Sequence, residues 1–321
     1  MNILITSAGQ RVSLVKAFKK ELSATYPGSK VYTTDMCPEL SAACHVSDRY
    51  FRVQRVTDPG YIDELMALCL REKIRMIVPT IDTELVVLAQ HRDLFEQEGI
   101  HLIVSSSDLI DKCRDKRKIN TFFEQHGIAV PAMIDRHQPT FPLFIKPYNG
   151  SLSVDTYVVH SETELRPEQV GNERLLFMEY LNKQDHDEYT VDMYYDRNGD
   201  VKCIVPRKRI LIRAGEINKG ITSKNGLLKY LREKLAHIEG ARGCLTAQFF
   251  LHKESGRITA IEINGRFGGG YPLSYHAGAN YPRWLIEEYF NGNTITYRED
   301  WEDQLLMLRY DDEVLVHAHK N

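Results

Sequence analysis

Long hydrophobic runs and an excess of one charge are both missing from this sequence of 321 residues. No apolar stretch approaches the ~20 residues that a membrane-spanning helix requires. Lysine and arginine number 41 against 44 aspartate and glutamate, which gives a formal net charge of −3. This balance predicts neither a general nucleic-acid binder nor a membrane-surface protein, so any strongly positive site must be local.

Cysteine is scarce, and the six residues present form no CxxC pair and no zinc-like spacing with histidine. The N-terminal segment lacks the basic and apolar regions of a secretory signal peptide. Free thiols without such a signal indicate a reducing compartment. We therefore expect a cytoplasmic protein.

Two familiar nucleotide-binding motifs are also absent. The chain has no GxxxxGK[ST] sequence, and the loop at residues 6–11 carries a lone Gly9 in place of GxGxxG. A dinucleotide-dependent oxidoreductase is therefore a weak alternative that depends only on the N-terminal α/β pattern. No internal repeat or low-complexity segment is present.

Residues 1–107 show short apolar strands that alternate with amphipathic helices. The strands fall near residues 3–5, 31–34, 76–79 and 101–104, and the helices near 12–22, 61–70 and 84–95. This alternation predicts a parallel sheet covered on both faces. Ligands bind such sheets beyond the carboxyl ends of the strands, so we expect loops 6–11 and 79–82 to face a site.

From residue 108 the pattern changes to one polar helix, over residues 108–126, followed by longer, hairpin-like strands. Asn198-Gly199 is a strong hairpin signal. The strands are expected at 144–146, 153–160, 175–180, 188–195, 201–212, 244–251 and 258–264, with a helix over 225–237. This half predicts an antiparallel α+β domain.

The densest chemical pattern is the alternation of Glu262, Asn264 and Arg266. Side chains two residues apart on a strand share a face, and antiparallel pairing with the preceding strand would bring Gln248 beside Glu262. Carboxylate and amide oxygens suit Mg²⁺, and a guanidinium suits phosphate. A solvated strand face is the alternative, but Gly268–Gly270 argues against it because its backbone N–H groups can approach an anion.

Two weaker patterns precede this one. Lys146 ends an apolar strand before a small-residue turn, which can place an ammonium and backbone N–H groups on a phosphate chain. The strand that ends at residues 179–181 can present its backbone to a flat heterocycle, and Glu188 can accept hydrogen bonds from ribose. Taken alone, Lys146 fits an ordinary edge strand equally well, and a solvated acidic loop is the better interpretation of Glu188.

The order of these elements resembles the ATP-grasp superfamily over nearly the whole chain. It is most similar to the synthetase domains of the carbamoyl-phosphate synthetase large subunit and to related small carboxylate–amine ligases, including the pyrrolysine-pathway ligase. The residues that carry the resemblance are Lys116, Lys146, Glu179–Leu181, Glu188, Gln248, Glu262, Asn264 and Arg266.

The resemblance implies an N-terminal Rossmann-like (pre-ATP-grasp) α/β domain over residues 1–107 and an α+β ATP-grasp domain over 108–321. The second domain would divide into a first nucleotide-binding subdomain, 108–181, and a second subdomain with the metal site, 182–321.

The resemblance also implies how ATP would be bound. Lys116 would reach the phosphates, and Lys146 the α-phosphate and the N7 side of adenine. Glu188 would hold the ribose. The adenine slot would be lined by Met178, Glu179, Tyr180 and Leu181, with Glu179 and Leu181 acting through backbone groups.

For the metal and the chemistry, the implied roles fall on the last two strands. Gln248, Glu262 and Asn264 would bind two Mg²⁺ ions, or Mn²⁺, with Glu262 bridging. Arg266 would stabilise the transferring phosphoryl group and, with Lys146, is expected to be catalytic. Arg207, Arg209 and Arg213 fit a further phosphate or carboxylate contact.

The implied function is ATP-dependent ligation of a small-molecule carboxylate to an amine, through an acyl phosphate, with release of ADP and phosphate. No nucleic-acid or membrane partner is expected, and a homodimer is one option. The main alternative is a non-catalytic, regulatory ATP-binding protein, which would be expected to lose its metal ligands.

Three features lie outside the family pattern or leave the substrate open. The loop Gly150–Asp155 has a single glycine and an acid where family loops are richer in glycine and carry a basic residue. His276 is a candidate near the acceptor site. Arg11, Arg213 and Lys219 could receive an anionic substrate or be solvated surface groups, and no residue set encodes one amine.

Overall fold

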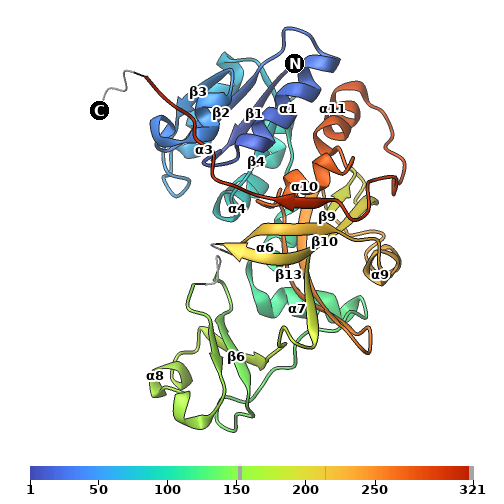
Figure 1. Cartoon of the computed structure of the whole chain (residues 1–321). Helices are drawn as coiled ribbons and strands as arrows, with labels where there is room; N and C mark the ends of the chain where they lie inside the picture. Colours follow the sequence, from blue (N-terminus) through green and yellow to red (C-terminus); the bar gives the residue numbers. More distant parts are fainter. Residues whose placement is uncertain (151–153, 214, 318–321) are drawn as a thin grey trace.

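The computed structural model describes residues 1–150, 154–213 and 215–317. Within these residues the strands form three sheets, which follow one another along the long axis of the molecule (Figure 1). A five-stranded sheet lies at the top of that view, a six-stranded sheet in the middle and a three-stranded sheet at the bottom.

The N-terminal sheet is parallel throughout, in the order β3-β2-β1-β4-β5. Its strands are β1 (Asn2–Thr6), β2 (Val31–Asp35), β3 (Arg49–Arg52), β4 (Ile74–Pro79) and β5 (His101–Leu102). Its helices are α1 (Val12–Thr25), α2 (Ala42–Val46), α3 (Tyr61–Arg71), α4 (Asp82–Gln90) and α5 (Arg92–Gln97), and η1 (Pro38–Leu40) is a 3₁₀ turn. The predicted parallel sheet is confirmed. The sequence pattern missed β3 because this edge strand is largely exposed and has arginine at both ends.

The strand order creates a crevice at the carboxyl ends of β1 and β4. These neighbours lie at the centre of the sheet, and the chain leaves them toward opposite sides. Such a switch point is the usual ligand position in an open parallel sheet. It lies beside the loops at residues 7–11 and 80–82, as the sequence predicts.

The prediction of a single helix over residues 108–126 is wrong in one respect, because the structure has two helices there. They are α6 (Ser107–Arg114) and α7 (Lys116–Gln125), separated by Asp115. Asp115 has an extended backbone, and its side chain accepts a hydrogen bond from the Arg117 N–H as the N-cap of α7. This cap starts a new helix at Lys116, which sets the direction of that side chain.

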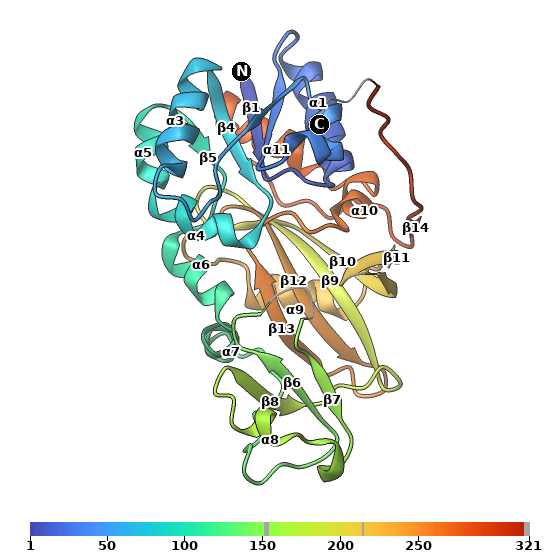
Figure 2. The same ribbon diagram turned by 90° about the vertical axis from the view of Figure 1, so that its left-hand side faces the viewer.

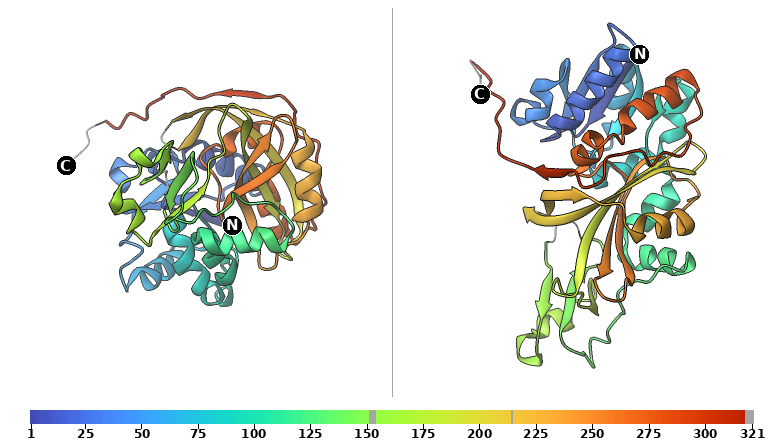
Figure 3. Two further views of the ribbon diagram at one scale, coloured as in Figure 1. Left: turned by 90° about the horizontal axis from the view of Figure 1, so that it is seen from below. Right: turned by 45° about the vertical axis from the view of Figure 1, so that its right-hand side comes forward.

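The smallest sheet forms a lobe below the large sheet (Figure 3). Its antiparallel strands, in the order β7-β6-β8, are β6 (Leu143–Pro147), β7 (Tyr157–Val159) and β8 (Leu175–Glu179), with η2 (Glu162–Glu164) and α8 (Pro167–Val170) between β7 and β8. β7 is shorter than the predicted 153–160. Ser153 lies outside the described residues, and Asp155 has φ 55°, which a continuing strand does not adopt.

The large sheet is antiparallel, in the order β13-β12-β9-β10-β11-β14 (Figure 2). Its strands are β9 (His186–Tyr195), β10 (Val201–Arg213), β11 (Glu216–Thr222), β12 (Gly243–His252), β13 (Ile258–Asn264) and β14 (Leu306–Leu308). The helices of this region are α9 (Gly226–Lys234), α10 (Tyr271–His276) and α11 (Tyr281–Asn291). The predicted hairpin at Asn198-Gly199 joins β9 to β10.

The C-terminal part of the chain returns to the N-terminal sheet. Helix α11 packs against α1 (Figure 2), and the rings of Phe290 and Tyr26 meet edge to face at 5.9 Å. An α/β part followed by an α+β part confirms the predicted fold class, whereas the domain limits at residues 107 and 181 remain predictions. None of the helices in the described part of the chain combines the length and hydropathy that a bilayer crossing requires.

Candidate active site

A cavity of about 750 Å³ lies where the three sheets meet. Its walls come from the crevice of the N-terminal sheet, from β6 and β8 of the small sheet, and from β12 and β13 of the large sheet. Eleven of the residues that the sequence predicts for the site line this cavity: Lys116, Lys146, Met178, Glu179, Tyr180, Leu181, Glu188, Gln248, Glu262, Asn264 and Arg266.

The predicted metal ligands are neighbours on paired strands. Gln248 of β12 lies opposite Glu262 of β13, as the sequence pattern predicts, and the Asn264 amide donates a hydrogen bond to Glu262 Oε1 at 3.2 Å. Within the described residues, no three His, Cys, Asp or Glu side chains converge as a metal site. Two amides and one carboxylate are hard oxygen donors, a set that fits Mg²⁺ shared with phosphate oxygens.

Glu188 is tied into the same wall. The Gln248 side-chain N–H donates a hydrogen bond to Glu188 Oε1, and the Arg209 Nε lies 3.2 Å from the same oxygen. Glu188 and Arg209 are each 9% exposed, so this is a buried ion pair. The bond uses the amide nitrogen of Gln248 and leaves its oxygen for another ligand.

Two buried lysines lie on the opposite side. Lys146 on β6 is 6% exposed, and burial lowers its pKa to about 8, an effect that Glu262 opposes and Lys116 reinforces. Burial also lowers the pKa of Lys116, whose ammonium donates to the Gly150 carbonyl at 2.6 Å. Among the described residues, neither lysine has a carboxylate within ion-pair distance, which leaves both cations open to an anion.

The predicted adenine slot lies at the end of β8. The Glu179 N–H donates to the Ala132 carbonyl at 2.8 Å, and the Ala132 N–H donates to the Glu179 carboxylate at 3.2 Å. The Leu181 N–H has no partner within the described residues. Of the two backbone groups predicted for adenine, the N–H of Leu181 is therefore free, whereas Glu179 could use only its carbonyl.

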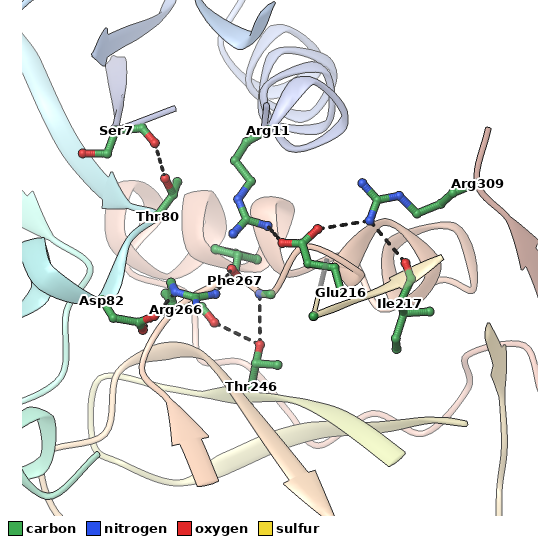
Figure 4. Close-up of polar contacts among 12 residues, drawn as sticks. Ser7, Arg11, Thr80, Asp82, Glu216, Ile217, Thr246, Arg266, Phe267 and Arg309 are labelled. Carbon is green, nitrogen blue, oxygen red and sulfur yellow. Dashed lines mark hydrogen bonds and ion pairs between the residues drawn. The ribbon is translucent and has the colours of Figure 1, made fainter. Parts of the chain in front are cut away.

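Arg266 forms an ion pair that the sequence did not predict (Figure 4). Its Nε and Nη2 donate to the two carboxylate oxygens of Asp82 at 3.0 and 2.6 Å, and its Nη1 donates to the Phe267 carbonyl at 3.2 Å. Asp82 is the first residue of α4, directly after β4. This bidentate pair joins the N-terminal sheet to the metal strand.

A second ionic cluster missed by the sequence lies beside it (Figure 4). Glu216 stands between two guanidiniums, with Arg11 Nη1 at 3.4 Å and Arg309 Nη1 at 3.1 Å. The sequence predicts that the loop of Arg11 faces the site. Arg309 carries no sequence signal, because it follows the short edge strand β14.

The other basic residues considered for anion binding divide into two groups. Arg207 and Arg209 line the cavity, and fully buried Arg207 holds Asp192 through two contacts of 2.8 and 2.9 Å. The remaining candidates do not line the cavity. Arg213 pairs with Asp311 at the surface, and Lys219 and His276 are exposed.

The run Gly268–Gly270 serves close packing. The Gly268 N–H donates to Thr246 Oγ1 at 3.0 Å, and a Cβ at Gly269 would lie 2.0 Å from the Glu216 carboxylate. A Cβ at Gly270 would lie 2.2 Å from Arg207 Nη1. Glycine is needed here because three polar side chains close against this backbone.

Only part of the atypical loop can be placed. Gly150 and Val154 line the cavity, and Ser151, Leu152 and Ser153 lie outside the described residues. The predicted phosphate contact of this loop therefore remains a prediction.

Two family descriptions match the sequence. Residues 3–103 match the family described as PylC-like, N-terminal domain, and residues 171–311 match the family described as ATP-grasp in the biosynthetic pathway with Ter operon. Comparison with curated proteins found no match.

Many solved structures share the fold. The biotin carboxylase domain of Hydrogenobacter thermophilus 2-oxoglutarate carboxylase is 15% identical, with a TM-score of 0.71 over 94% of this chain and 72% of that one. N5-carboxyaminoimidazole synthetase from Staphylococcus aureus is 15% identical, with a TM-score of 0.68 over 96% and 79%. The L-amino acid ligase of Bacillus licheniformis is 17% identical, with a TM-score of 0.66 over 90% and 73%. Residues 3–103 thus match a PylC-like N-terminal domain and residues 171–311 an ATP-grasp domain, and these solved structures show that the chain shares their fold over nearly its whole length.

Proposed function

We propose that this protein is an ATP-dependent carboxylate–amine ligase that forms an amide through an acyl phosphate and releases ADP and phosphate. The observation that carries the proposal is the convergence of two open lysines, three oxygen-donor side chains and one arginine on a single cavity. ATP is a polyanion with a flat base, and this cavity offers cations at one wall and a strand end at another.

Each wall would take one part of the nucleotide. Lys116 and Lys146 would contact the phosphates, Glu188 the ribose, and Met178 to Leu181 the base. Structures similar in fold support this assignment, since the carboxylase domain was solved with MgADP and the N5-carboxyaminoimidazole synthetase with ADP.

Gln248, Glu262 and Asn264 would hold Mg²⁺ against the nucleotide. Bound there, the ion would neutralise charge on the β- and γ-phosphate oxygens. These side chains supply a single formal negative charge, so the phosphates would provide the remaining ligands.

The proposed reaction needs the protein to position the substrates and to stabilise charge, and it needs no covalent bond between protein and substrate. A carboxylate is a poor electrophile because its leaving group would be oxide. Transfer of the γ-phosphoryl group to a carboxylate oxygen gives an acyl phosphate and ADP. Amine attack on the acyl carbon then forms the amide and expels phosphate, and the amine loses a proton. Arg266 would offset the charge that develops during phosphoryl transfer.

The two alternatives predict different cavities. A non-catalytic ATP-binding protein has no need of metal ligands, yet Gln248, Glu262 and Asn264 lie together on paired strands. An oxidoreductase would need an open glycine turn after β1. Here the Gly9 N–H donates to Asp35 at 3.0 Å, and the Gly9 carbonyl accepts from Ser41 at 2.9 Å. The ligase proposal uses the three metal ligands and requires no open glycine turn after β1.

The test is phosphate release from Mg-ATP in the presence of paired carboxylates and amines. We expect release that depends on acceptors, with ADP as the nucleotide product. Hydroxylamine added during turnover should trap the activated carboxylate as a hydroxamate, and oxygen-18 from the carboxylate should appear in phosphate. Release of AMP and pyrophosphate would instead indicate an adenylating enzyme, and a change in NAD(P)H absorbance an oxidoreductase.

A further inference from the structure

The Glu216 cluster has the composition of a binding site for an anion. In the part of the chain that the structure describes, the carboxylates in ion pairs with Arg11, Arg266 and Arg309 are two, those of Asp82 and Glu216. Within the described residues the cluster therefore carries one excess positive charge. An added anion would make it neutral.

Arg11 is the least satisfied member of this cluster. Its side chain is 19% exposed, and its one ion-pair contact is 3.4 Å long. Within the described residues its guanidinium donates no hydrogen bond, although it carries five N–H groups. Burial lowers the pKa of Arg11, with Glu216 opposing that effect. Arginine stays charged under all ordinary conditions, so this half-buried cation keeps N–H groups that can donate to a further acceptor.

Glu216 occupies a place shaped for a carboxylate and can leave it. Its carboxylate lies directly against the Cα of Gly269, where any other residue would put a Cβ. The side chains of Glu216 and Arg309 are 37% and 39% exposed. Rotation of Glu216 toward solvent would therefore bury no charge. It would leave Arg11, which lines the cavity, and Arg309, which is partly exposed outside the lining, without their shared carboxylate.

We propose that Glu216 fills, in the substrate-free protein, the position of an anionic group of the substrate, and that Arg11 and Arg309 exchange Glu216 for that group. The substrate would then carry a carboxylate or a phosphate in addition to its reacting group. Arg11 and Arg309 are specificity-determining residues in this arrangement, and the Glu216 carboxylate competes with the anionic group of the substrate for their guanidiniums. The inference rests on the proposed function only in taking this cavity as the substrate site.

The test is calorimetric titration of the full chain with succinate, inorganic phosphate and glycine at constant ionic strength, without nucleotide. Omitting nucleotide makes the result independent of ligase activity. Glu216→Gln should bind succinate or phosphate about five- to tenfold more tightly, because the competing pair is partly exposed. Arg11→Gln should bind the same probe at least about tenfold more weakly than wild type. Preference for succinate or phosphate distinguishes the two anion classes.

Matched controls come from the exposed pair Lys229–Glu233 on α9, which lies outside the cavity. Lys229→Gln and Glu233→Gln change one charge of each sign and should leave every affinity unchanged. Phosphate bound by Lys116 and Lys146 would be insensitive to Arg11→Gln, and such insensitivity for every probe would overturn the proposal. Weaker binding of glycine to Glu216→Gln than to wild type would also overturn the proposal, because Glu216 would then be a partner for an ammonium group. Absence of succinate and phosphate binding in every variant would overturn it as well.

Discussion

The two ends of the cavity hold their cations in opposite ways. At the lysine end (Lys116 and Lys146), the ammonium groups are buried without an ion-paired carboxylate among the described residues. At the arginine end (Arg11 and Arg266 in the lining, with Arg309 outside it), every guanidinium faces an acid. A lysine can release its proton when it is buried alone, whereas an arginine cannot and must keep a counter-charge.

This difference indicates that the two ends of the cavity would bind an anion in different ways. At the lysine end a polyanion can bind without displacing another group, and its binding would restore full protonation of Lys146. The arginine end already holds two internal anions, so a ligand there must displace one or fit beside both. Four variants test this contrast.

The largest expected effect is at Glu262, which faces both lysines and supplies the single carboxylate of the predicted metal set. Glu262→Gln should reduce Mg-ATP-dependent phosphate release by at least roughly 10²–10³, the range seen when one group that stabilises a transition state is removed. Thermal unfolding should change little. The control is Glu254→Gln, in the exposed turn between β12 and β13. Near wild-type turnover of Glu262→Gln would refute the metal assignment.

Arg266→Lys should lower turnover by a comparable factor of roughly 10²–10³ while ATP binding weakens little. The lysine keeps the charge and loses the planar fork that holds Asp82 and would hold a phosphoryl group. Parallel measurement of the ATP dissociation constant and of hydroxamate formation separates the two effects. Equal losses in binding and turnover would contradict a role in the transition state.

Lys146 should produce opposite pH trends in stability and in nucleotide binding. An unfolded chain keeps the lysine proton up to about 10.5, whereas the folded protein loses it near 8. Between these values the unfolded state binds more protons, so the free energy of unfolding rises with pH. ADP affinity should fall over the same range, by up to about tenfold per pH unit, as the cation is lost. Lys146→Met should remove both trends, and trends that persist in this variant would belong to other groups.

Asp82→Asn should destabilise the fold by about 1.5–3 kcal/mol, because it breaks two charged hydrogen bonds at a partly buried position. The measurement is chemical denaturation, with a double-mutant cycle against Arg266→Gln. The exposed pair Arg283–Glu287 on α11 is the control, for which we expect no more than about 0.5 kcal/mol. A coupling energy between Asp82 and Arg266 as small as that of the control would mean that the pair does not hold the two sheets together.

Much of the site was predictable because its order along the chain is a local property. Strand periodicity places Glu262 and Asn264 on one face, and antiparallel pairing of neighbouring hairpin strands places Gln248 opposite Glu262. The parallel N-terminal sheet follows from alternating strands and helices for the same reason. Two short exposed edge strands were missed, because β3 has arginine at both ends and β14 is only three residues long.

The sequence by itself determined the two sheet types, the strand order of the metal motif and the set of residues expected to bind ATP. Only the tertiary structure decided that Asp82 holds Arg266 and that Glu216 stands between Arg11 and Arg309. All three contacts join residues more than 90 positions apart. Asp82–Arg266 and Arg11–Glu216 link the parallel sheet to the antiparallel sheet, whereas Arg309 reaches Glu216 from the end of the neighbouring strand β14. Periodicity fixes which face of a strand a side chain occupies, but an ion pair across two sheets depends on how their packed cores dock.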